Sequence, residues 1–265
     1  MTPVRLGAVG YLNARPLVFG LDRSPRFDLR YDVPSECARL LHAGDIDLGL
    51  IPSIEYLRGD SYRIVPDVAI ASRGPVASVA LFTTRPMADV RSIVMDTSSR
   101  TSAALVRVLC ARLFKIDPAI EAHPPDLKAM LDRADAALII GDKALIWVPD
   151  NRQIQKIDLG EAWTSLTGLP FVWAFWAGPA GVLGAADVSA LQSAREAGVQ
   201  QSDTIGREYF RDLPQHRDLG AQYLRDNIKY YLGADERAGL ELFYRYAAEI
   251  AVVDAAPDSQ SLRFY

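Results

Sequence analysis

The chain has 265 residues, of which 49% are hydrophobic and 23% charged, with a formal net charge of −4. This composition is typical of a globular protein and excludes nucleic acid or an anionic membrane as a charge-driven partner. No apolar run approaches the ~20 residues that a membrane span requires.

The start of the chain predicts its location. Met1 leads directly into a strand-like segment without a basic region, an apolar stretch or a cleavage site, as a secretory signal would have. Cys37 and Cys110 are too few for a disulfide scaffold or a zinc site, and both lie in helix-like apolar patterns. We therefore expect reduced core cysteines and a cytoplasmic protein.

Short apolar runs alternate with helical patterns in the first part of the chain. The patterns predict a short helix at 16–21, a helix from Pro34 that Gly44 ends, and strands at 4–9, 27–31 and 47–51. This alternation is typical of βαβ units and a parallel sheet.

The middle of the chain continues the alternation, and the last part is helical. A helix follows Thr97–Ser102 and ends before Asp117–Pro118. Further strands are expected at 68–71, 79–82, 92–95 and 136–140. After Ala185 only helices are expected, at 187–197, 202–210, 221–232 and 235–250.

The order of the elements predicts an α/β fold of two lobes with a central cleft. We expect residues 1–84 and 175–265 to form a discontinuous first lobe and residues 85–174 a second. The two interdomain crossings are expected near Thr83–Pro86 and Phe171–Ala177. Clefts between lobes are favoured ligand sites.

Familiar catalytic signatures are missing. The sequence has no G-x-G-x-x-G, P-loop, G-x-S-x-G or H-E-x-x-H motif. His42, His123 and His216 lie far apart and share no spacing with carboxylates. We therefore expect no bound metal, no cofactor and no histidine base.

Polar residues at predicted strand ends are the candidate ligand contacts. Asn13 follows the first strand, where the ligand crevice of an open α/β sheet lies, but the position also suits a helix cap or turn. The segment Thr97–Ser102 has the hydroxyls and free N–H groups of an anion site or of simple capping. Ser53 and Ser78 could each line the cleft or be an ordinary turn residue. The aromatic side chains of Trp163–Trp176 are expected either to form the apolar wall of a pocket or to pack in the core.

Four segments together resemble the chorismate dehydratase family of the futalosine route to menaquinone: Gly10–Leu17, Gly44–Ser53, Thr97–Ser102 and Thr167–Phe175. The resemblance extends from about residue 4 to the C-terminal helices, and Tyr-Leu-Asn-x-x-Pro-Leu is its most specific part. It implies a type II periplasmic-binding-protein-like fold.

The resemblance also implies a reaction, conversion of chorismate to 3-[(1-carboxyvinyl)oxy]benzoate and water by a hydro-lyase. Asn13 would be the catalytic residue, at the ring or the leaving hydroxyl. The substrate-binding residues would be Tyr11, Ser53, Ser78, Ser99, Thr101, Ser102 and Gly168. No side chain is an evident base, and the enolpyruvyl carboxylate of the substrate is the other candidate acceptor.

Three other functions remain open at this point. A solute-binding protein of the same fold would carry a secretory signal or lipoprotein cysteine, and a transcription-factor effector domain would follow a helix-turn-helix segment. The sister enzyme that makes 1,4-dihydroxy-6-naphthoate has a different first-strand motif. The oligomeric state is also open, with a homodimer as one form.

Overall fold

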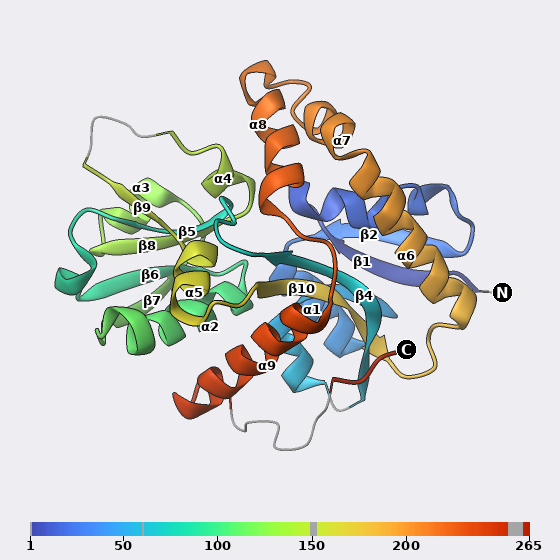
Figure 1. Cartoon of the computed structure of the whole chain (residues 1–265), viewed down its shortest axis with the longest axis horizontal. Helices are drawn as coiled ribbons and strands as arrows, with labels where there is room; N and C mark the ends of the chain where they lie inside the picture. Colours follow the sequence, from blue (N-terminus) through green and yellow to red (C-terminus); the bar gives the residue numbers. More distant parts are fainter. Residues whose placement is uncertain (1, 60, 149–152, 254–261) are drawn as a thin grey trace.

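The computed structural model describes residues 2–59, 61–148, 153–253 and 262–265 (Figure 1). The strands are β1 Val4–Val9, β2 Phe27–Asp32, β3 Leu48–Pro52, β4 Tyr62–Ser72, β5 Val79–Thr83, β6 Ser92–Asp96, β7 Ala119–His123, β8 Ala136–Ile140, β9 Gln155–Asp158 and β10 Phe171–Pro179. The α-helices are α1 Pro34–Ala43, α2 Arg100–Leu109, α3 Leu127–Leu131, α4 Asp142–Leu145, α5 Leu159–Thr167, α6 Ala185–Gln200, α7 Ser202–Tyr209, α8 Arg217–Gln222 and α9 Ala234–Glu249. Short 3₁₀ segments include η1 Leu12–Val18, η2 Leu21–Arg23 and η3 Ser53–Arg58, and π-helical turns are η5 Cys110–Phe114 and η7 Tyr223–Asn227.

The strands form two five-stranded sheets that lie side by side, one in each lobe (Figure 1). The first sheet has the order β2-β1-β3-β10-β4, and the second has the order β7-β6-β8-β5-β9. In each sheet the first three strands are parallel, and β10, β4, β5 and β9 run antiparallel to their neighbours. The expected two-lobed α/β architecture is confirmed.

The chain passes between the sheets earlier than expected. β5 pairs with β8 and β9 of the second sheet, so the first crossing lies between Ser72 and Val79 and not near Thr83–Pro86. The return precedes Phe171, because β10 pairs with β3 and β4 along its length. A division of the chain at 84/85 and 174/175 stays a proposal, and the sheets favour slightly earlier boundaries.

The first crossing is held in shape by one carboxylate of the second lobe. Asp158 accepts the N–H groups of Val76 and Ala77 at 3.0 and 2.6 Å. Ala77 has a φ of +62°, which is unusual for a residue with a Cβ. Because backbone hydrogen bonds fix this conformation, the residues on both sides of the crossing have defined positions.

The segment that follows β1 is clamped between the first sheet and α6. η1 is largely buried, and its close partner on α6 is Gly198. A Cβ at Gly198 would overlap the backbone of Pro16, so only glycine allows this approach. The strand-to-helix turn therefore has little freedom to move.

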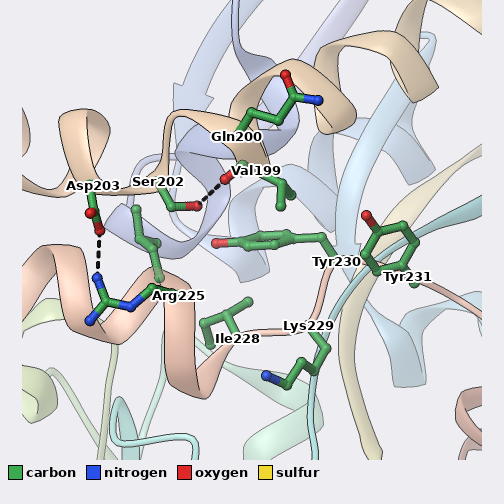
Figure 2. A pocket seen from close by; sticks show the side chains of 10 residues that line it. Val199, Gln200, Ser202, Asp203, Arg225, Ile228, Lys229, Tyr230 and Tyr231 are labelled. Atoms are coloured by element: carbon green, nitrogen blue, oxygen red, sulfur yellow. Dashed lines mark hydrogen bonds and ion pairs between the residues drawn. The ribbon is translucent and has the colours of Figure 1, made fainter.

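Two predicted helices differ from the structure. Helix 16–21 is wrong, because the 3₁₀ segment η1 starts at Leu12 and Pro16 lies inside it. Helix 221–232 ends at Asn227, since Lys229 forms a β-bridge with Ala71 and the chain is extended there. Tyr230 belongs to this extended segment, and its side chain is buried (Figure 2).

Several short elements of the second lobe were not predicted from the sequence. β7 and β9 lie at the edges of the second sheet and carry mostly partly buried or exposed residues, so their apolar pattern is weak. α3, α4 and α5 were likewise not predicted. Near the C-terminus Phe264 forms a bridge with Ile64, so the last part of the chain is not helical throughout.

Both cysteines are free and buried, as expected. Burial raises the pKa of the Cys37 thiol to about 12 and that of the Cys110 thiol equally. Within the described ranges, no helix combines the length and the apolar character that a bilayer crossing needs.

Gly198→Ala should destabilise the fold, because the added methyl meets backbone that cannot rotate away. We expect a loss of roughly 1–3 kcal/mol in the free energy of unfolding from this overpacking, despite the ~1 kcal/mol that alanine gains in helix propensity. Ser193→Ala, at an exposed position of the same helix, is the matched control. Urea denaturation of both variants measures the difference, and equal stabilities would contradict the close packing of η1 against α6.

Candidate functional site in the cleft

A pocket lies between the lobes where parallel strands of both sheets end. It is lined by residues just after β1, β3, β6 and β8, at the carboxyl edge where open α/β sheets bind ligands. As the lobes lie in this structure, its cavity volume is about 50 Å³, smaller than the roughly 300–1,000 Å³ of typical small-molecule sites. The lining residues are Val9, Tyr11, Asn13, Pro34, Pro52, Ile70, Val76, Val79, Ser99, Ser102, Ile140, Gly141, Trp173 and Ala174.

Asn13 lies in the pocket, and the helix-cap interpretation of this residue is wrong. The N-cap of η1 is Tyr11, and Asn13 is inside the helical segment. The Oδ1 atom of Asn13 is buried without a hydrogen-bond partner among the described residues. An unpaired buried acceptor costs free energy, so this atom is available to a donor from a ligand.

Tyr11 spans the gap between the lobes. Its ring lies against Gly141 of the second lobe, where an added Cβ would meet the ring at 2.9 Å. Its hydroxyl is 3.4 Å from Oγ of Ser98, and burial raises its pKa. Tyr11 therefore forms one wall of the pocket and also a contact that joins the lobes.

The predicted polar segment at 97–102 contributes two residues to the pocket. Ser99 is the N-cap of α2, since its Oγ accepts the Ser102 N–H at 3.3 Å. The Ser99 hydroxyl also donates to Oγ of Ser102 at 2.8 Å. Both hydroxyls line the pocket, so capping and ligand contact are compatible here.

Ser53 and Thr101 lie together but behind the pocket. Ser53 donates to the carbonyl of Val172 at 2.8 Å, and Oγ1 of Thr101 accepts the Ile54 N–H at 3.1 Å. Their hydroxyl oxygens are 3.4 Å apart. The two residues therefore join the start of α2 to the first lobe.

Ser78 and Gly168 are not among the lining residues. Ser78 is buried, and its Oγ accepts a hydrogen bond of 2.7 Å from the hydroxyl of Tyr223. Burial raises the pKa of Tyr223, and hydrogen bonding to Ser78 and to Asn13 opposes that rise. Gly168 ends α5 with a φ of +73° at an exposed position, so helix termination explains its glycine.

The aromatic segment serves both of its proposed purposes. Trp163, Phe171, Phe175 and Trp176 are core residues with almost no exposed surface. Trp173 instead lines the pocket, and its indole N–H donates to Ser72 at 3.1 Å. From this segment, Trp173 thus provides a flat apolar surface of the pocket.

Sequence analysis missed three residues at this site. Gly141 and Asp142 follow directly on β8, and Tyr209 ends α7. The strand-end rule that selected Asn13 applies equally to Gly141 and Asp142, so that signal was available. Tyr209 has no such signal, because its position depends on how α7 packs against η1.

The lining of the pocket has no carboxylate, ammonium, guanidinium or imidazole group among its described residues. No set of three His, Cys, Asp or Glu side chains is arranged to hold a metal ion in the described part of the chain. Hydroxyls, an amide and the N-terminus of α2 are the polar groups that face the ligand. Such groups bind and stabilise an anion without donating a full charge.

A second pocket of about 350 Å³ lies on the first lobe, beside the α6–α7 junction (Figure 2). Of its charged lining residues, Arg225 is paired with Asp203 at 2.7 Å and also with Asp226, outside the lining, at 3.1 Å. Lys229 donates to the carbonyl of Asp226 at 3.1 Å. Because Arg225 and Lys229 already bind other groups of the chain, we assign this pocket no ligand.

The chain matches the family described as menaquinone biosynthesis over residues 4–249. A chorismate dehydratase of Thermus thermophilus is 33% identical over 264 residues, covering 92% of this chain and 94% of the relative. A chorismate dehydratase of Campylobacter jejuni is 31% identical over 176 residues, covering 63% of this chain and 64% of the relative.

Solved structures show the same fold at low sequence identity. A protein from Archaeoglobus fulgidus superimposes with a TM-score of 0.75 at 16% identity, covering 95% of this chain and 99% of its own. The periplasmic aliphatic sulphonate binding protein SsuA from Escherichia coli superimposes with a TM-score of 0.67 at 16% identity, covering 100% of this chain and 92% of SsuA. The expected periplasmic-binding-protein-like fold is confirmed.

The contributions of Ser99 and Ser102 to stability can be distinguished by substitution. Ser99→Ala removes the cap of α2 and should lower the free energy of unfolding by about 1 kcal/mol. Ser102→Ala keeps the cap and loses only the hydrogen bond from the Ser99 hydroxyl, so it should cost less stability than Ser99→Ala, which loses both bonds. Thermal unfolding of the two variants measures this, and the reverse order would contradict the observed cap.

Proposed function

This chain belongs to the menaquinone biosynthesis family, and from that membership we propose that it is a chorismate dehydratase, a carbon–oxygen hydro-lyase. The two sequence relatives that carry this name support the proposal. The structural likeness to SsuA extends to the fold alone. Sequence similarity therefore favours the enzyme over a solute-binding protein.

The proposed reaction converts chorismate to 3-[(1-carboxyvinyl)oxy]benzoate and water. The ring carbon that bears the ether oxygen loses its proton, and the neighbouring carbon loses its hydroxyl group. The ring carboxylate, conjugated through the diene, activates the proton that leaves. Because the product is a benzene ring, aromatisation drives the elimination, and the protein mainly has to orient the ring and stabilise charge.

The unpaired Oδ1 of Asn13 is the observation that carries the assignment. A buried acceptor in a ligand pocket calls for a donor, and the hydroxyl group of chorismate is one. The amide N–H₂ of Asn13 can donate to the same oxygen as it departs. We therefore assign Asn13 to the leaving hydroxyl group.

The carboxylates of the substrate are assigned to the hydroxyl-rich side of the pocket. Ser99, Ser102 and Tyr11 face the space directly, and the N-terminus of the ten-residue α2 favours negative charge there. Ser53 and Thr101 support this side from behind through their hydrogen bonds, whereas Ser78 is bonded to Tyr223. Trp173 is assigned to the face of the ring.

The proton acceptor in this proposal is the enolpyruvyl carboxylate of the substrate. The described lining offers no carboxylate or imidazole that would compete for the proton. The carboxylate is tethered to the ether oxygen beside the reacting carbon, so proximity favours it. The proton held by the enolpyruvyl carboxylate combines with the departing hydroxide to give water, and the ring carboxylate stays available to spread the developing charge.

The proposal places the reaction in the futalosine pathway and in the cytoplasm, with no cofactor. Membership of a menaquinone biosynthesis family supports a biosynthetic setting. The ligand is a small molecule, and neither nucleic acid nor a membrane has a part in the proposal. A homodimer remains one form of the chain that the proposal allows.

Asn13→Ala should strongly lower turnover while keeping substrate binding. Loss of one group that stabilises the transition state costs ~100- to 1,000-fold in kcat. We expect this loss when chorismate is incubated with EDTA-treated protein and the aromatic product is followed by ultraviolet absorbance. Gln200→Ala, exposed on α6, is the control and should keep the parent rate.

Full turnover by Asn13→Ala would contradict the role of Asn13. If the parent protein gave no aromatic product but bound another metabolite tightly, the solute-binding function would replace the enzyme.

A further inference from the structure

We propose that Asp142 is a positioning residue, which holds the backbone that carries Asn13 from the opposite side of the cleft. Tyr209 completes the hydrogen bonding of Asp142 in this arrangement. The inference rests on the proposed function, because it assigns Asp142 a task in the reaction of Asn13.

Three elements meet at the Asp142 carboxylate. Oδ1 accepts the backbone N–H of Leu12 at 3.2 Å, and Oδ2 accepts the hydroxyl of Tyr209 at 2.6 Å. Asp142 belongs to the second lobe, whereas Leu12 and Tyr209 belong to the first. The carboxylate is thus a direct hydrogen-bonded link between the lobes, one residue from Asn13.

The N–H of Leu12 depends on this link. Leu12 is the first residue of η1, so its N–H has no acceptor within that segment. A carboxylate from the second lobe satisfies it at the point where the chain turns into the pocket. Removal of this acceptor would free the turn that directs the side chain of Asn13.

Gly141 makes the contact surface for the same segment. It has a φ of +66°, and an added Cβ would meet the ring of Tyr11 at 2.9 Å. Gly141 therefore admits the ring, and Asp142 binds the next N–H along the chain. Two successive residues of the second lobe, Gly141 and Asp142, thus contact two successive residues of the first lobe, Tyr11 and Leu12.

The buried charge of Asp142 requires the hydrogen bonds that it accepts from Leu12 and Tyr209. Burial raises the pKa of the Asp142 carboxyl, and the hydrogen bonds from Tyr209 and Leu12 oppose that rise, as does Arg15. A buried carboxylate is costly unless it is hydrogen-bonded. Asp142 is therefore stable here only while the Leu12 segment and Tyr209 lie in place.

Arg15 orients Tyr209. Its guanidinium carbon lies 4.4 Å from the ring centroid of Tyr31 and 5.3 Å from that of Tyr209. It also donates to the carbonyl of Gly10 at 3.2 Å. The Tyr209 hydroxyl is 3.1 Å from the same carbonyl, so both side chains fix the start of the turn.

Substitution at Asp142 separates positioning from general stability. Asp142→Ala should lower kcat with chorismate by ~10- to 100-fold, as expected for loss of hydrogen bonds to a charged group. KM should change less than about threefold, because the groups that bind the carboxylates stay intact. Tyr209→Phe should give a smaller loss of kcat. The controls are Asp126→Asn and Tyr265→Phe, which lie outside the cleft and should keep the parent kinetics.

The conservative variant tests the mechanism. Asp142→Asn keeps an Oδ1 that accepts from Leu12, so it should recover most of the kcat lost in Asp142→Ala. If Asp142→Asn were as impaired as Asp142→Ala, the carboxylate charge and not the link to Leu12 would be responsible, and the proposal would be overturned. A kcat within about twofold of the parent in Asp142→Ala would overturn it as well.

A measurement without substrate keeps the proposal separate from the proposed function. In Asp142→Ala, hydrogen exchange of the Leu12 amide should accelerate at least ~10-fold, while the amides of Leu6 and Ala8 in β1 keep their protection. Unchanged exchange at Leu12 would refute the link. Faster exchange in a protein that does not dehydrate chorismate would refute the proposed function and keep Asp142 as the residue that positions the turn.

Discussion

The contact between Tyr11 and Gly141 fixes how near the two lobes come to each other. A Cβ at residue 141 would lie 2.9 Å from the tyrosine ring, so the ring rests directly on the backbone of the second lobe. Around this contact the ends of β1, β3, β6 and β8 point into one space. The start of α2 is held to the first lobe by the Ile54–Thr101 hydrogen bond and by the 2.7 Å ion pair of Arg100 with the buried Glu55. The pocket is thus defined by bonds between lobes.

The polar groups of the mostly apolar lining are uncharged, and this agrees with the chemistry proposed for the pocket. An elimination that ends in an aromatic ring needs orientation and charge stabilisation more than a strong acid or base. The amide of Asn13 and the hydroxyls of Ser99 and Ser102 supply directional hydrogen bonds in the pocket. The carboxylate of Asp142, a charged residue beside this arrangement, accepts the backbone N–H of Leu12.

Sequence patterns predicted the parts of the fold that depend on local order. Alternation of buried strands and helices gave the lobes, and the position of Asn13 after β1 gave its place in the pocket. The cap at Ser99 was also visible, because serine before a helix is a local signal. Edge strand β9 and the extended segment at Lys229 were missed, since their partners and not their apolar pattern determine them. Asp142 and Tyr209 reach the site from points 130 and 197 residues beyond Leu12, a relation that no local pattern contains.

The crystal structure of Asn13→Ala with chorismate tests the central claim most directly. The account predicts unreacted chorismate between the lobes, with its ring against Trp173 and a carboxylate at Ser99 and Ser102. Chorismate bound outside the cleft, or a cleft that stays empty at saturating chorismate while the variant is folded, would contradict it.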